Sequence, residues 1–146
     1  MNDRFKFRAW NKLSGEMKDV LSLNINYNFP ECSNVILETN SFDNIKTHNN
    51  PITCANGIDN VVLMQCTGLK DCKGKLIYEG DIVKYKDEVY GLCIGKIEWD
   101  NVHYELQYYT GKEYGWFSHI LCLKHIKNIE VIGNIYENKE LLNENS

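Results

Sequence analysis

The sequence has 146 residues, of which 43% are apolar and 25% are charged, and its formal net charge is −4. This length suits one domain, or one domain with an appendage, and it is long enough to bury a core without disulfide staples. The negative net charge argues against a protein that binds nucleic acid over its whole surface. Arginine, which contacts phosphate and guanine well, occurs only at Arg4 and Arg8, and this scarcity argues in the same direction.

The sequence contains no segment typical of a membrane-spanning helix or of a signal peptide. No apolar run approaches the roughly 20 residues that cross a bilayer, and no apolar stretch follows the charged N-terminus as in a signal peptide. We therefore expect a cytoplasmic protein without membrane contact. In that compartment the six cysteines are expected to be free thiols, mostly buried as small apolar side chains.

The N-terminal part predicts a β-hairpin followed by loop. Residues 5–10 alternate between two sets of side chains, which is the period of a strand. Residues 11–15 carry Asn, Ser and Gly and predict a turn, so that residues 16–23 return as the second arm. Residues 24–60 are rich in Asn and hold both prolines, which predicts loop apart from a short strand at residues 35–37.

The C-terminal part predicts several short strands joined by tight turns. The first covers residues 61–67, where Gly68 is expected to stop it, and Gly80 is expected to form a corner with positive φ. Further strands are expected at residues 82–85, 89–99, 102–108 and 129–135, with a helical turn at 139–142. Asp100-Asn101 is expected to be a two-residue hairpin connection. Such an arrangement, bent by glycines, favours a small closed β barrel.

Three stretches together resemble the YopX family of phage and prophage proteins, and they are residues 5–10 (FKFRAW), 64–83 (MQCTGLKDCKGKLIYEGDIV) and 129–138 (IEVIGNIYEN). The resemblance implies an SH3-like barrel in the C-terminal half and a gene carried by a phage or prophage in a bacterial host cell. It implies no established catalytic residues. We thus expect a mainly β protein, with an N-terminal hairpin and variable loop-rich segment at residues 1–60 and an SH3-like β-barrel domain at residues 61–146.

Catalytic and metal sites find little support in the sequence. His119, Cys122 and His125 have the side chains that zinc prefers, but on a strand Cys122 would point away from both histidines. No paired C-x-x-C spacing accompanies them. The carboxylates that could supply an acid–base pair are Asp81, Glu88, Glu98, Asp100 and Glu105. Because no nucleophile or base pairs with them in the sequence, we predict no catalytic residue, no metal and no cofactor.

Two binding functions remain open. The first is protein binding or self-assembly, as a homo-oligomer or with a host or phage protein, since Tyr and Trp are favoured at interfaces. The second is single-stranded nucleic-acid binding, in which lysines hold the backbone and aromatic rings stack on bases. Aromatic residues at period two could equally fill a barrel interior. The candidate binding residues are Lys70, Lys73, Lys75, Lys84, Tyr104, Tyr108 and Trp116.

Overall fold

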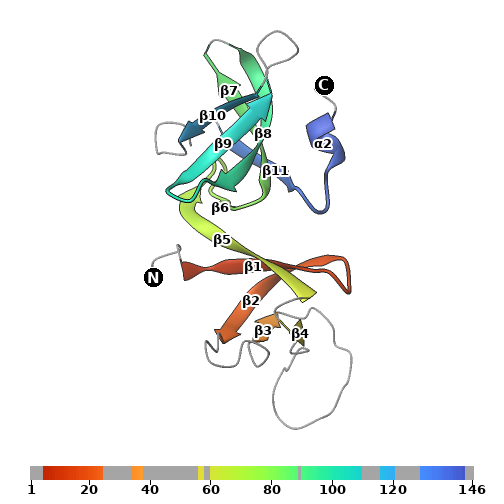
Figure 1. The fold of residues 1–146 in the computed structure, drawn as a ribbon. Helices are drawn as coiled ribbons and strands as arrows, with labels where there is room; N and C mark the ends of the chain where they lie inside the picture. The colour runs from red at the N-terminus through yellow and green to blue at the C-terminus, as the bar shows by residue number, and fades with distance from the viewer. Residues whose placement is uncertain are drawn as a thin grey trace. The chain divides into compact units, whose positions relative to one another are not determined.

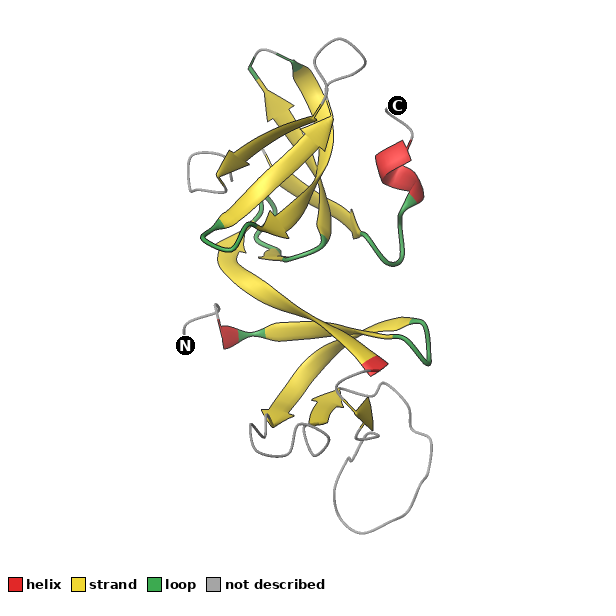
Figure 2. Ribbon diagram, viewed as in Figure 1, coloured by secondary structure: helices red, strands yellow, loops and turns green. Residues whose placement is uncertain are grey.

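The computed structural model describes residues 5–24, 34–37, 56–57, 60–88, 90–109, 116–120 and 129–143 (Figure 1). Strands dominate these residues, as Figure 2 shows, so the chain is mainly β as expected. It divides into two compact units. The N-terminal unit is Phe7–Met64, and the C-terminal unit is Gln65–Ser146 together with Met1–Lys6. The division falls inside strand β5 (Val61–Lys70).

The N-terminal unit is built on the predicted hairpin. Its strands are β1 (Phe7–Asn11), β2 (Glu16–Asn24), β3 (Asn34–Leu37) and β4 (Asn56–Gly57), and the sheet order is β4-β3-β2-β1-β5. The hairpin turn forms because the Asn11 side chain accepts hydrogen bonds from the amides of Leu13 at 2.9 Å and Ser14 at 3.3 Å. A small core of Ala9, Val35 and Val61 is buried in this unit.

The C-terminal unit contains a five-stranded antiparallel sheet. Its strands are β7 (Asp81–Asp87), β8 (Gly91–Trp99), β9 (Tyr104–Tyr109), β10 (Trp116–Ile120) and β11 (Ile129–Asn134), in the order β10-β9-β8-β7-β11. The latter part of β5 pairs with β6 (Leu76–Tyr78), and a short helix, α2 (Glu140–Asn143), ends the described chain. Among the described strands, no ladder joins β10 to β11, so the sheet is not closed. The SH3-like barrel therefore stays a prediction.

Strand alternation gives the five-stranded sheet two unlike faces. The inner face carries the buried core, which consists of Ile77, Val83, Tyr85, Cys93, Ile97, Leu106, Tyr108, Ile129 and Val131, with Ile77 contributed by β6. The other, outer face is more polar and more exposed, and it carries Lys84, Lys86, Leu92, Lys96, Glu98, Glu105, Gln107 and Glu130, together with the half-buried Ile94 and the buried Ile82. The apolar residues on the inner face supply the main stabilisation of this unit.

Three local predictions were wrong, each for a reason of geometry. Gly68 does not stop β5, which continues to Lys70, because Gly68 takes a φ of 81° inside a register shift. The connection after β8 is longer than Asp100-Asn101, since Trp99 pairs with Tyr104. Strands β4, β6 and β10 were not predicted, because β4 and β6 have only two and three residues and the residues of β10 do not alternate clearly between apolar and polar types.

The turn after β11 is closed by side chains of the third family-like stretch. Asn134 Oδ1 accepts hydrogen bonds from the amides of Tyr136 and Glu137, both at 3.0 Å. Asn138 Oδ1 accepts one from the amide of Asn134 at 3.3 Å. A Cβ on Gly133 would lie 2.9 Å from the Cβ of Asn138, which is closer than real Cβ atoms approach. Glycine is therefore needed here for the close approach of Asn138.

The helical content of the described residues is small. Their longest α-helix is α2, which has four residues. Within the part of the chain that the structure describes, no helix has the length and apolar character to span a bilayer.

Candidate functional site

The predicted lysines lie around the turn after β5 and on the neighbouring strand β7. Lys70 ends β5, Lys73 and Lys75 lie in the following turn, and Lys84 lies on the outer face of the sheet. All four side chains are exposed. The structure thus brings the predicted lysines to the surface of one unit.

Asp71 fixes the shape of the turn that carries these lysines. Its Oδ1 accepts hydrogen bonds from the amides of Lys73 at 2.9 Å and Lys75 at 2.8 Å, and its Oδ2 accepts one from Val131 on β11 at 3.0 Å. Burial raises the pKa of Asp71, but the three amides outweigh burial and hold the pKa below that of an ordinary aspartate. Asp71 is therefore a structural carboxylate that ties the lysine turn to the sheet.

Part of the lysine charge is offset by a carboxylate. Lys73 Nζ lies 2.6 Å from Glu130 Oε1, and Glu130 stands opposite Lys84 in the pairing of β11 with β7. The hydrogen bond from Lys73 lowers the pKa of Glu130 and raises that of Lys73. Because Lys73 is exposed and Glu130 is half-exposed at the surface, the pair contributes little to stability. It does reduce the positive potential around Lys84.

Two of the predicted aromatic residues, Tyr104 and Tyr108, lie on the face of the sheet opposite to Lys84. Tyr108 is wholly buried on the inner face, where its ring lies 6.0 Å from that of Tyr85. Tyr104 is half-buried on the same face and meets Trp99 edge to face at 4.9 Å. Trp116 opens β10 opposite Tyr109. Tyr108 thus has no exposed ring for a base, a correction that follows from the direction in which β9 faces the core.

Apolar side chains are exposed at both ends of β8. Trp99 is 45% exposed and Val102, in the connection to β9, is 79% exposed. Leu92 and Tyr90, near the start of β8, are 65% and 37% exposed. Trp99 and Val102 are three positions apart in the chain, and exposed apolar side chains that form one contiguous patch commonly mark contact surfaces. We call Trp99 and Val102 the hairpin patch.

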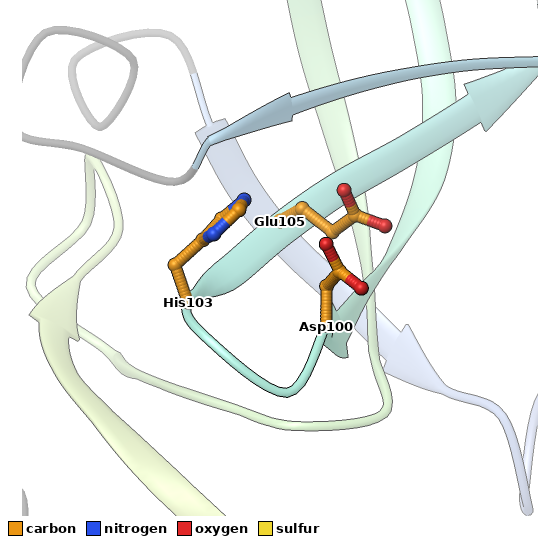
Figure 3. Close-up of side chains that lie close together, drawn as sticks. All are labelled: Asp100, His103 and Glu105. Carbon is orange, nitrogen blue, oxygen red and sulfur yellow. The ribbon is translucent and has the colours of Figure 1, made fainter.

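The connection from β8 to β9 also gathers an imidazole and two carboxylates. Asp100, His103 and Glu105 have ligand-type atoms that all lie within 4.8 Å of one another, and Figure 3 shows the three side chains grouped at the start of β9. Gln107 Nε2 donates to Glu105 Oε1 at 2.6 Å. That hydrogen bond lowers the pKa of Glu105, burial opposes it, and Ser118 lowers it further.

Sequence reasoning found only part of this group. Asp100 and Glu105 are among the candidate carboxylates of the sequence, whereas for His103 the sequence predicts only a position in the strand at residues 102–108. The signal that could have found it is the short D-x-x-H-x-E spacing across a hairpin connection, which returns the chain on itself. These three residues are the described ones that could hold a metal ion together.

The remaining candidates are not members of this group. Asp81 is buried and structural, since its Oδ2 accepts a hydrogen bond from the Tyr78 amide at 2.7 Å. Glu98 pairs with Lys96 at 2.8 Å, and Glu88 is exposed in the turn between β7 and β8. His119 lies in β10, opposite Leu106. Cys122 and His125 lie outside the described residues.

Three cysteines can be described, and all three are free thiols. Cys66 and Cys93 are buried and Cys72 is exposed. Cys66 and Cys72 therefore form no disulfide with each other, in agreement with the expectation of free thiols. Cys93 belongs to the inner-face core, where it packs as a small apolar side chain.

Burial raises the pKa of two ionisable side chains, Glu79 and Tyr136. Burial raises the pKa of Glu79, opposed by the amide of Gln65 and reinforced by the charge of Glu98. Burial also raises the pKa of Tyr136, and the nearby charge of Glu79 adds to the shift. Such shifts reflect the cost of placing charge in a half-buried position.

Comparison with known proteins agrees with the resemblance seen in the sequence. Residues 6–143 match the family model described as YopX protein. The chain is also similar to the crystal structure of protein EF1440 from Enterococcus faecalis, with 25% sequence identity and a TM-score of 0.54. That similarity covers 94% of this chain and 96% of the other. No curated protein sequence matches this chain.

Proposed function

This chain belongs to the YopX family, and from that premise we propose that it is a non-enzymatic accessory protein of a phage or prophage that binds protein, above all a second copy of itself. It would act in the cytoplasm of the bacterial host. The proposal includes an SH3-like arrangement of the five C-terminal strands. Its support is that these strands enclose one core on a single face.

The observation that carries the proposal is the exposed hairpin patch. Trp99 and Val102 stand at a hairpin end, and the ring of the half-buried Tyr104 contacts the Trp99 ring edge to face. Tryptophan contributes strongly to protein interfaces, because its large ring loses much water-exposed surface on contact. A hairpin end reaches beyond the sheet and can meet a partner without a change of fold. These properties favour contact with a protein over contact with a small molecule.

The face of the β8–β9 hairpin opposite to Trp99 carries charges of both signs. Lys96 and Glu98 lie 2.8 Å apart there, and Glu105 stands directly opposite Glu98. A second copy that contacts this face together with the hairpin patch would meet both signs of charge. In a twofold contact the same surface meets itself, so a surface of one sign would repel and a mixed surface can pair.

The experiment is native mass spectrometry of the intact protein, together with light scattering during gel filtration. Self-association gives a multiple of 17.0 kDa. Val102→Lys, at a position 79% exposed, should shift the mass toward the single chain without disturbing the core. Leu13→Lys is the matched control, since Leu13 is 68% exposed in the other unit. A wild-type mass of one chain at every concentration would reject self-assembly.

Single-stranded nucleic-acid binding is the second candidate, favoured by the exposed lysines. Lys70, Lys75 and Lys84 are all exposed in one unit, and such groups suit a phosphate backbone. The burial of Tyr108 removes one stacking ring, and Tyr104 lies on the opposite face of the sheet from Lys84. We therefore rank this function below protein binding.

Salt dependence tests the nucleic-acid function. Anisotropy of a labelled oligothymidylate should show binding that weakens steeply between low and high salt, because phosphate contacts release counterions. Replacing Lys70, Lys75 and Lys84 together by Gln should reduce both the affinity and the slope of that dependence. Binding that is absent at low salt, or unchanged in the triple variant, would remove this candidate.

A further inference from the structure

We propose that Asp100, His103 and Glu105 form a binding site for a divalent transition-metal ion, with zinc as the ion that best fits the donors. The site goes beyond the proposed function and requires no second copy. Its basis is the grouping of one imidazole and two carboxylates within 4.8 Å at the β8–β9 hairpin (Figure 3).

The hairpin backbone holds two of the three ligands in place. The Asp100 amide donates to the His103 carbonyl at 2.9 Å, which closes the connection. Asn101 turns the chain with a φ of 54°, a conformation that Asn adopts more readily than most residues. His103 and Glu105 follow at alternate positions into β9. The ligands thus come from a rigid supersecondary element, which reduces the entropy lost on binding a metal.

The distances require only side-chain adjustment. Bonds of about 2.0–2.2 Å in a tetrahedral shell separate the donor atoms by about 3.3 Å. The present separations are at most 4.8 Å, so rotation of the exposed Asp100 and half-buried His103 side chains can close the shell. Three protein ligands leave one position open, which water can take.

Surrounding charge favours a cation at this position. Glu98 stands directly opposite Glu105, and carboxylates so placed repel each other. Lys96 interacts with both of them, through its pair with Glu98 at 2.8 Å and its charge near Glu105. Asp100 adds a third carboxylate. One ammonium group does not neutralise three carboxylates, and a divalent ion would complete the balance.

A neighbouring side chain orients one ligand in the way that metal sites commonly need. The Gln107 amide donates to Glu105 Oε1 at 2.6 Å, which fixes the carboxylate relative to the strand. Groups that hold a ligand in this way typically raise metal affinity about 10–100-fold. The imidazole selects against calcium and magnesium, which prefer oxygen donors alone, and favours zinc.

The test is titration of the intact, metal-stripped protein with zinc, followed by calorimetry and by the added mass in native mass spectrometry. We expect one zinc per chain at this site. His103→Ala and Asp100→Asn should each weaken binding by about tenfold or more, the scale on which even indirect ligand support acts. Glu88→Gln, which changes an exposed carboxylate in another turn, should leave affinity unchanged. Far-UV circular dichroism confirms that each variant is folded.

The absorption spectrum of the cobalt-loaded protein distinguishes binding at this site from binding at a cysteine thiolate. A cobalt complex of Asp100, His103 and Glu105 has no sulfur-to-metal charge-transfer absorption, whereas a thiolate site does. A folded wild type that takes up no zinc, zinc affinity unchanged in the two variants, or thiolate absorption from cobalt would each overturn the proposal. If His103→Ala does not fold, Asp100→Asn decides alone. A single-chain mass carrying one zinc would support this site while rejecting self-assembly, so the two proposals fail independently.

Discussion

Replacing Asp71 by Asn should destabilise the C-terminal unit through one lost backbone contact. Asn keeps one carbonyl oxygen, which can still accept from the amides of Lys73 and Lys75, now at 2.9 and 2.8 Å from Oδ1. The other oxygen is replaced by the NH2 of the side-chain amide, which only donates hydrogen bonds. It then faces the Val131 amide, a donor that lies 3.0 Å from Oδ2 in the native chain. Turning the side chain over would lose two contacts in place of one.

The cost follows from the charge and burial of Asp71, which is 5% exposed. A hydrogen bond to a charged group contributes about 1.5–3 kcal/mol, and the two remaining bonds also weaken when the charge is lost. We expect the free energy of unfolding to fall by about 2–4 kcal/mol. With a urea dependence of about 2 kcal/mol per molar, the unfolding midpoint should fall by about 1–2 M.

The pH dependence gives this prediction a second readout. The pKa of Asp71 is lowered in the folded state, so its stabilisation is present at neutral pH and is lost as the pH falls through the folded-state pKa. The difference between wild type and Asp71→Asn should therefore shrink from about pH 5 downward. Asp19→Asn, at an exposed site on β2, is the control and should unfold like wild type.

Urea denaturation at pH 7 and in acid, followed by tryptophan fluorescence and circular dichroism, measures both effects. Equal midpoints for wild type and Asp71→Asn at pH 7 would refute the role given to the Val131 contact. A difference that persists undiminished in acid would show that the loss comes from shape and not from the charge of Asp71.

Two further substitutions test packing and burial. Gly133→Ala should lower the free energy of unfolding by about 1–3 kcal/mol, because its Cβ would lie 2.9 Å from that of Asn138 and force the turn apart; an unchanged thermal midpoint would contradict this close approach. Glu79→Gln should raise the thermal midpoint slightly at pH 8, because burial raises the pKa of Glu79 and the charged form costs stability above that pKa. That gain should vanish as the pH falls toward 4, and a gain that is equal at both pH values would argue against an electrostatic cause.

The family-like motifs act in the fold as their composition indicated. Gly80 takes a positive φ of 74°, as expected for the corner before β7. Gly133 and Asn138 close the turn after β11, and Asp71 joins that strand to the turn after β5. These structural roles explain why the motifs are rich in Gly, Asp and Asn: the residues form turns and join strands.

The sequence by itself determined the strand class, the first hairpin and which residues share a strand face. Period-two alternation in 102–108 predicts that Val102, Tyr104, Leu106 and Tyr108 share a face, because neighbouring side chains on a strand point to opposite sides. The last three do so in β9, whereas Val102 precedes the strand, in the connection from β8. Asn11 and Gly15 specified the first turn through contacts a few residues apart. Such features depend on local geometry, and local geometry is encoded in adjacent residues.

Only the tertiary structure decided which face of each strand meets the core and which distant residues meet. Alternation is symmetric between the two faces, so it could not tell that Tyr108 is buried while Lys84 is exposed. The contact of Asp71 with Val131 joins residues 60 positions apart, and that of Lys73 with Glu130 joins residues 57 apart. Strand register sets these contacts, and register depends on how the whole sheet packs its apolar side chains.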